Sequence, residues 1–148
     1  MLFLSLLFLL FSIYGLINGR LFHKFQLENA KYTVKHKKGE IKDIPSEHIV
    51  KGLFFFGYAV VMLILQIILV INAIKIDPLL YPTLAFIVVM FINFIVAQKS
   101  SKADLDTEIG IAQYLSKAAR KRSFKGLVFG ILNVAYFTYL FAVLLGLV

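Results

Sequence analysis

Residues 53–97 read LFFFGYAVVMLILQIILVINAIKIDPLLYPTLAFIVVMFINFIVA, and this stretch decides the fold. It holds two long apolar runs separated only by the tetrapeptide KIDP. At about 1.5 Å per residue, helices of this length reach across a hydrocarbon core about 30 Å thick. Asp77 can cap the second helix, and Pro78 suits its first turn. We therefore predict transmembrane helices over about 53–74 and 79–97, joined as a tight antiparallel hairpin.

Two further apolar runs flank this hairpin and predict helices over about 2–22 and 126–148. No basic residue precedes the first run and no small-residue cleavage pattern follows it, so we expect a retained membrane helix and not a secretory signal peptide. Its last turn would hold Arg20 at the interface. The expected fold is an all-α membrane protein, one domain over 1–148, with four transmembrane helices in a left-handed antiparallel bundle.

Composition excludes several classes of protein. With 60% hydrophobic residues, 16% charged residues and a mean hydropathy of +0.85, the 148-residue chain is too apolar for an ordinary soluble domain. It contains no cysteine, which excludes disulfides, thiolate zinc sites and palmitoylation, and argues against the four-helix quinone-linked disulfide oxidoreductases. The excess of Lys over Arg, with many Phe and Ile, is typical of an AT-rich genome and favours a bacterial source.

The basic residues predict the orientation. Of the sixteen Lys and Arg residues, all but Lys75 lie within 20–51 or 99–125. Because loops rich in Lys and Arg stay cytoplasmic, the loops over 23–51 and 98–125 should face the cytoplasm. Both termini and the turn at Asp77 should then be extracytoplasmic, in a multi-pass protein of the plasma membrane.

The two basic loops differ in pattern. In the first, residues 20–30 can extend the first helix, and Lys38-Gly39 gives a hairpin signal within 32–44 that would need support from the membrane or the other loop. Pro45-Ser46-Glu47 resembles the first turn of the next helix. In the second loop we predict an amphipathic helix over about 102–122, near the membrane or against the first loop. Its signals are a capping box at Ser101 and Asp104, a dipole-matched charge order and apolar residues on one face.

Small or polar residues recur about every seven positions in each apolar run. A period of seven predicts left-handed packing, and small residues mark close approach of helices in lipid. The packing residues predicted on this basis are Ser12, Gly19, Ala59, Gln66, Asn93, Gly126, Gly130 and Asn133. The three amides could instead line a polar pathway, but transport sites usually need an ionisable group at membrane depth, which favours hydrogen bonding between helices.

The last run carries a second face, formed by Ala135, Tyr139, Ala142 and Gly146. This face can pack against a partner protein or a second copy, or against a neighbouring helix of the same bundle.

Basic clusters suggest contact with anionic lipid headgroups, although they could act only as topology determinants. The residues concerned are Lys35, Lys37, Lys38, Arg120, Lys121 and Arg122. A lipid bilayer is therefore the expected partner, and nucleic acid is not. The histidines His23, His36 and His48 lack the regular spacing of metal ligands and are interpreted as surface residues beside the headgroups, with no metal and no cofactor.

In layout, the chain resembles the membrane-associated family of eicosanoid and glutathione metabolism, which has four helices, a long first cytoplasmic loop and about this length. The region that carries that family's Arg and Asn signature reads SEHIVKG at 46–52 here, without Arg or Asn.

The expected function is that of a non-catalytic accessory, stabilising or immunity-type partner of another membrane protein. The alternatives are an enzyme that conjugates lipids or thiols, using Arg20 and His23 at the cytoplasmic interface, and a small transporter. The enzyme requires a cavity lined by Arg20 and His23. The transporter requires a continuous polar path past Gln66, Asn93 and Asn133.

Overall fold

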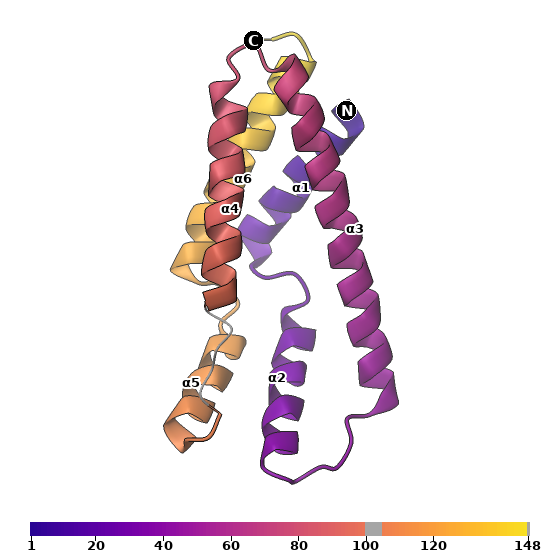
Figure 1. The fold of residues 1–148 in the computed structure, drawn as a ribbon, viewed down its shortest axis with the longest axis vertical. Coiled ribbons are helices and arrows are strands. Elements are labelled where there is room, and N and C mark those ends of the chain that lie inside the picture. Colours follow the sequence, from indigo (N-terminus) through magenta and orange to yellow (C-terminus); the bar gives the residue numbers. More distant parts are fainter. Residues whose placement is uncertain (100–104, 148) are drawn as a thin grey trace.

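The computed structural model describes residues 1–99 and 105–147, in which all regular structure is helical. In chain order the helices are α1 (Leu2–Asn18), α2 (His23–Lys37), α3 (Ser46–Ile76), α4 (Tyr81–Lys99), α5 (Glu108–Ala119) and α6 (Phe124–Leu144). In Figure 1, α1, α4 and α6 form the upper part and α2 and α5 the lower part, α3 runs along both, and both chain ends lie near the α3–α4 turn. The all-α class expected from the sequence is confirmed.

Two stretches are long and apolar enough to cross a membrane by themselves. One is α3, and the other is Glu108–Leu144, which runs from α5 through α6. The pair α1 and α2 passes the same test only when taken together, and it is bent by 63°. The apolar part of α4, Tyr81–Ile95, is shorter. The described residues therefore contain two or three candidate spans, where the sequence predicts four.

The helix predicted over 2–22 ends earlier, at Asn18. Gly19 follows with φ 83° and ψ −152°, a combination essentially confined to glycine. Phe22 is left-handed, with φ 58°, and precedes α2. The backbone N–H of Arg20 donates to the carbonyl oxygen of Lys121 at 3.0 Å. The break between α1 and α2 therefore contacts the link between α5 and α6.

A helix replaces the hairpin suggested for the first loop. α2 continues to Lys37 and ends in a Schellman motif: Glu40 N–H donates to the Lys35 carbonyl at 3.0 Å, and Gly39 N–H donates to the His36 carbonyl at 3.1 Å. Gly39 has φ 72°, the left-handed conformation that such a motif requires. The glycine therefore ends a helix and does not turn a hairpin, which answers the question that the sequence left open for this loop.

α2 packs against the start of α3 through aromatic rings. α3 begins at Ser46, as the Pro45-Ser46-Glu47 pattern predicts. Its His48 is buried, with the imidazole centroid 4.7 Å from the rings of both Phe25 and Tyr32. The interpretation of His48 as a surface residue was therefore wrong, because α2 covers it.

Side-chain caps begin the last two helices. The Thr107 hydroxyl accepts from Gly110 N–H at 3.1 Å and begins α5. The Ser123 hydroxyl accepts from Gly126 N–H, also at 3.1 Å, and begins α6. The amphipathic helix predicted over 102–122 thus covers only Glu108–Ala119 of the described residues, and the proposed capping box at Ser101 and Asp104 lies outside them.

The buried core lies between α1, α3, α4 and α6, toward the end that carries the α3–α4 turn. Phe86 stacks on Tyr136 with centroids 3.9 Å apart and rings inclined by 8°. Phe8 stacks on Phe137 at 5.4 Å. Around them lie the buried side chains Leu69, Val70, Ala73 and Leu140. This core closes one end of the helix assembly and leaves the opposite, basic end more open.

Candidate functional site

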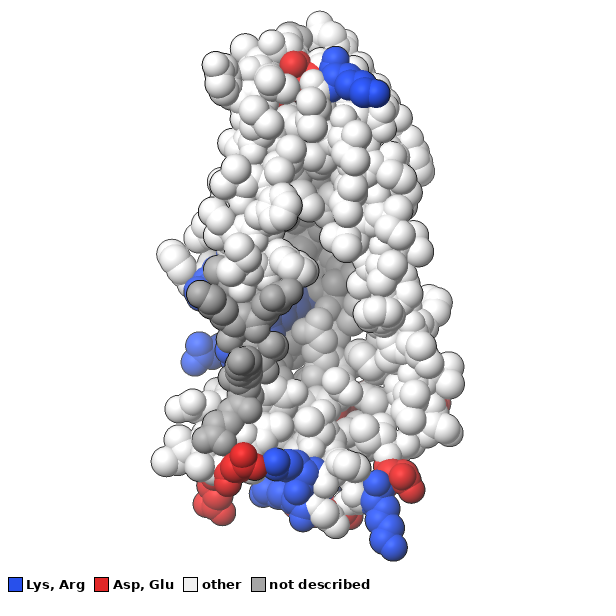
Figure 2. Space-filling model, in the orientation of Figure 1, with Lys and Arg blue, Asp and Glu red and all other residues white. Residues whose placement is uncertain are grey.

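A cavity of about 680 Å³ lies between α1, α3, α4 and α6, on the side of the core that faces α2 and α5. Figure 2 shows a hollow in the surface with Lys or Arg atoms inside it. Apolar side chains form its inner wall, among them Phe8, Met62 and Phe137. Phe8 and Phe137 also belong to the buried core, so the cavity ends where the core begins.

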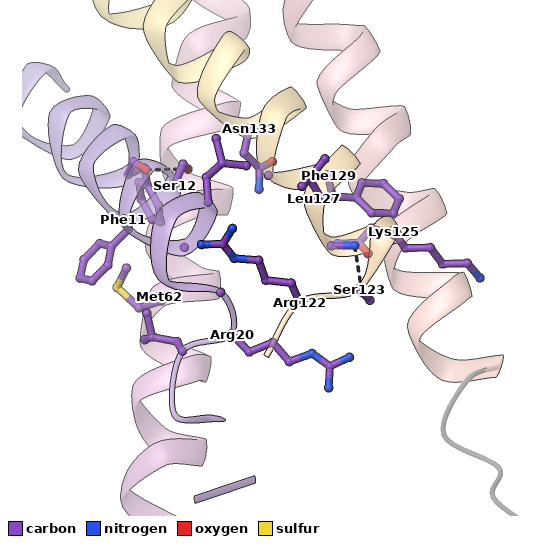
Figure 3. Close-up of a pocket in the computed structure, with 18 of the residues that line it drawn as sticks. Phe11, Ser12, Arg20, Met62, Arg122, Ser123, Lys125, Leu127, Phe129 and Asn133 are labelled. Carbon is purple, nitrogen blue, oxygen red and sulfur yellow. Dashed lines mark hydrogen bonds between the residues drawn. The ribbon is translucent and has the colours of Figure 1, made fainter. Parts of the chain in front are cut away.

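Four basic residues line the mouth of this cavity. They are Arg20, Lys121, Arg122 and Lys125. Figure 3 shows the Arg122 side chain extending toward α1, whereas the Lys125 side chain extends away. Arg20 makes one long hydrogen bond, 3.5 Å from Nη1 to the Lys117 carbonyl. Across residues 1–99 and 105–147, none of the four has a carboxylate within ion-pair distance. The mouth therefore carries concentrated positive charge without a counter-ion from the described chain.

Close backbone contact holds this mouth together. Besides the hydrogen bond from Arg20 N–H to the Lys121 carbonyl, Gly19 lies against the same carbonyl. A Cβ at Gly19 would come within 2.5 Å of the Lys121 oxygen and 3.1 Å of Arg122 Cγ. Glycine is therefore required for Arg20 and Arg122, about a hundred residues apart in sequence, to line one cavity.

The amides predicted to pack between helices line the same cavity. Gln66 comes from α3, Asn93 from α4 and Asn133 from α6, and Ser12 of α1 lies among the lining residues. The Ser12 hydroxyl is already used, since it donates to the Phe8 carbonyl at 2.7 Å. Gln66, Asn93 and Asn133 thus present amide groups to the space between the helices.

The remaining predicted packing residues differ in environment. Gly130 of α6 faces α1 closely, because a Cβ there would lie 3.0 Å from Leu16 Cδ1. At Gly126 the nearest atom is the hydroxyl of its own cap, Ser123, at 3.1 Å. Ala59 is exposed on α3. Gly130 is therefore the glycine that allows α1 and α6, the pair with the most extensive helix contact, to approach.

A second polar cluster joins the α3–α4 turn to α6. Asp77 Oδ1 accepts from Leu79 N–H at 3.1 Å and Tyr139 O–H at 2.5 Å, and Oδ2 accepts from Thr83 N–H at 3.2 Å and its hydroxyl at 2.6 Å. The Thr83 hydroxyl also lies 3.2 Å from the Tyr136 hydroxyl. Burial raises the pKa of Asp77, but the hydrogen bonds from Thr83, Tyr139 and Leu79 hold that pKa below its ordinary value. With every acceptor position used internally, the cluster fastens the turn.

The residues of the predicted partner face are not equivalent in the structure. Ala135 is exposed and Ala142 is partly buried. Tyr139 is directed to Asp77 within the chain. Gly146 follows the end of α6 with φ 70°, where Leu147 N–H donates back to the Ala142 carbonyl at 3.0 Å.

The predicted headgroup residues divide into two groups. Lys35, Lys37 and Lys38 lie at the exposed end of α2, where Lys37 pairs with Asp106 at 2.7 Å. Arg120 is exposed after α5, whereas Lys121 and Arg122 line the cavity mouth.

The pair of groups required by the conjugating enzyme is not brought together. Arg20 lines the cavity, but His23 does not, since its Nε2 lies 3.0 Å from the Ala119 carbonyl. His36 is exposed.

A cavity lined by Arg20 was expected only as a requirement of the conjugating enzyme, and reasoning from the sequence missed that Arg122 and the three amides line it too. The available signal was the coincidence of three amides in the apolar runs with arginines at two of their boundaries, at 20 and 122. Comparison with protein-family models, curated proteins and solved structures finds no match to the chain.

Proposed function

We propose that this chain is a bacterial plasma-membrane protein in which α1, α3, α4 and α6 each cross the bilayer as a left-handed four-helix bundle. The arrangement in Figure 1 supports this placement, because the chain ends and the α3–α4 turn lie at one end and α2 and α5 at the other. The positive-inside rule then places α2 and α5, with most of the basic residues, in the cytoplasm. Both chain ends are extracytoplasmic in this proposal.

Within this placement, the protein acts by binding, as a non-catalytic accessory, stabilising or immunity-type partner of another membrane protein. The observation that carries the proposal is that α2 and α5 contact each other at both ends of the pair. The Lys37–Asp106 ion pair joins one end at 2.7 Å, and the His23 imidazole lies 3.0 Å from the Ala119 carbonyl at the other. A pair of helices held in this way presents its exposed side chains in a preorganised arrangement, which lowers the entropic cost of docking.

Affinity purification from membranes in mild detergent, with quantitative mass spectrometry, tests this function. We expect one membrane protein to co-purify stoichiometrically. Charge reversal at Lys31, which is exposed on α2, should reduce its recovery several-fold. The matched control is Lys75→Glu at the opposite end of α3, which should leave recovery unchanged. Purification of the wild-type chain without a stoichiometric protein partner would refute the accessory role.

The cavity favours a second function, the binding of a small amphiphile within the bundle. The conjugating enzyme considered from the sequence requires the His23 imidazole in the cavity, but that imidazole contacts the Ala119 carbonyl instead. Transport along the amides would require a path past Phe8 and Phe137, which instead end the cavity against the core. Non-covalent binding requires neither the His23 imidazole nor a path through the core. An assay of retained small molecules in the same purified sample separates this function from the accessory role.

A further inference from the structure

The cavity between α1, α3, α4 and α6 combines a cationic mouth with an apolar interior. We propose that it binds one anionic phospholipid, with the phosphate at Arg20 and Arg122 and the start of an acyl chain along Met62 and Phe8. This proposal rests on the membrane placement above but not on a protein partner.

The charge at the mouth points to a phosphate. Arginine offers several N–H donors in a plane that match two phosphate oxygens at once. Arg20 and Arg122 come from opposite sides of one contact, the hydrogen bond between Arg20 N–H and the Lys121 carbonyl. No carboxylate of the described residues neutralises either guanidinium. In addition, α6 begins here at Phe124, so the positive end of its dipole adds to the field.

The interior indicates an amphiphile and not a free anion. A site for inorganic phosphate would be enclosed by donors, whereas this cavity continues past its basic residues to Met62, Phe8 and Phe137. Its volume of about 680 Å³ lies within the usual range for small-molecule sites and far exceeds what a phosphate needs. Between mouth and interior, the amides of Gln66 and Asn133 can donate to ester oxygens.

The position of the mouth agrees with a lipid that enters the cavity from the cytoplasmic leaflet. It lies at the end of the bundle next to α2 and α5, where the basic residues gather (Figure 2). Anionic lipids are concentrated in the leaflet that faces the cytoplasm. A lipid of that leaflet therefore has its phosphate at the depth of the arginines and its chains toward the apolar wall.

Retention of lipid by the purified chain tests the proposal. The protein is reconstituted in nanodiscs of phosphatidylcholine containing a minor fraction of phosphatidylglycerol, released in mild detergent and weighed by native mass spectrometry. We expect one phosphatidylglycerol per chain, with phosphatidylcholine at least tenfold less. In Arg122→Gln, apparent affinity for phosphatidylglycerol should fall about 10- to 100-fold, because charge-assisted hydrogen bonds to the phosphate are lost.

Arg120→Gln is the matched control, since it removes the same charge two residues away from a side chain that does not line the cavity. A second pair, Arg20→Gln against Lys24→Gln on exposed α2, repeats the comparison if Arg122→Gln fails to fold by circular dichroism. Equal loss in the cavity and control variants would overturn the proposal, as would equal retention of phosphatidylcholine. Glycerol 3-phosphate should not displace the lipid at millimolar concentration. If it does, the site takes a free phosphate and the lipid assignment fails.

Discussion

The contact between Gly19 and Lys121 makes a sharp prediction, because a single methyl group tests it. Gly19 adopts φ 83° and ψ −152°, and a Cβ there would lie 2.5 Å from the Lys121 carbonyl oxygen. Real Cβ atoms do not come so close to a backbone oxygen, so Gly19→Ala must shift the α1–α2 break away from the α5–α6 link. The hydrogen bond from Arg20 N–H to that carbonyl is then lost or lengthened.

The expected magnitude follows from two terms. Holding a non-glycine residue in this backbone region costs about 1–3 kcal/mol. Loss of the Arg20 hydrogen bond adds about 0.5–1.5 kcal/mol. Gly39→Ala is the matched control, since Gly39 has φ 72° but no atom lies within 4 Å of its Cβ position. In that variant the free energy of unfolding should fall only by the cost of holding a non-glycine residue in the left-handed conformation, about 1–2 kcal/mol.

Stability is measured by titrating purified protein in mild detergent with sodium dodecyl sulfate and following helix content by circular dichroism, since the chain has no tryptophan. From the central values, about 3 and about 1.5 kcal/mol, we expect Gly19→Ala to lower the free energy of unfolding by about 1.5 kcal/mol more than Gly39→Ala, because only Gly19 contacts another segment. Equal losses of unfolding free energy in the two variants would show that Gly19 does not pack against the Lys121 carbonyl. The contact that forms the cavity mouth would then be refuted.

Two further substitutions test other contacts. Gly130→Leu should lower the melting temperature in detergent, since its Cβ would already lie 3.0 Å from Leu16 Cδ1 and overpacking costs about 1–3 kcal/mol. The control Gly57→Leu should leave the melting temperature unchanged, because the space around Gly57 is open. An unchanged melting temperature for Gly130→Leu would contradict close packing of α1 and α6. Asp77→Asn should lower the free energy of unfolding by about 2–4 kcal/mol, because charge-assisted hydrogen bonds are lost. Asp43→Asn, at an exposed position, should leave the free energy of unfolding almost unchanged. Because the pKa of Asp77 is lowered on folding, its contribution is complete above the unfolded-state pKa of about 3.9 and is lost as the pH falls through the lower folded-state pKa. The amide introduced by Asp77→Asn cannot titrate, so identical acid unfolding profiles for the wild type and this variant would contradict that assignment.

The sequence predicted the helices whose signals are local. α3, α4 and α6 form on the apolar runs predicted to be helices, although α3 begins at Ser46, before its predicted start at 53, and residues 77–80 join α3 to α4. Asp77 caps α4 by accepting from Thr83 N–H, although α4 begins at Tyr81 and Pro78 precedes its first turn. Periodicity and length were sufficient there because a long apolar run has few alternatives to a helix.

The break after α1 had a local signal that was given too little weight. A glycine directly after an apolar run commonly ends a helix, and Gly19 stands in that position. The prediction instead extended the helix so that it reached across a full bilayer. The same residue type ended α2 at Gly39, where short polar and apolar alternations had suggested a hairpin. In both cases a glycine with positive φ follows the end of a helix.

The set of residues that lines the cavity could not be predicted, because it depends on contacts between distant segments. Arg20 and Arg122 meet only through the approach of Gly19 to Lys121. Likewise, the periodicity that identified Gln66 and Asn133 placed them on inward faces but could not show that a space remains between those faces. Patterns along one helix predict which side faces inward, whereas the space enclosed depends on how all four helices pack.

Membrane orientation is the central claim, since the cytoplasmic position of the cavity mouth and of the α2–α5 pair depends on it. The chain has no cysteine, so single cysteines can be introduced at Lys38, Lys75, Ser116 and Leu147 without background. In intact cells, a membrane-impermeant maleimide should label the variants at Lys75 and Leu147. The variants at Lys38 and Ser116 should react only after permeabilisation. Labelling of Lys75 and Leu147 from opposite sides, or of Lys38 from outside, would contradict the account.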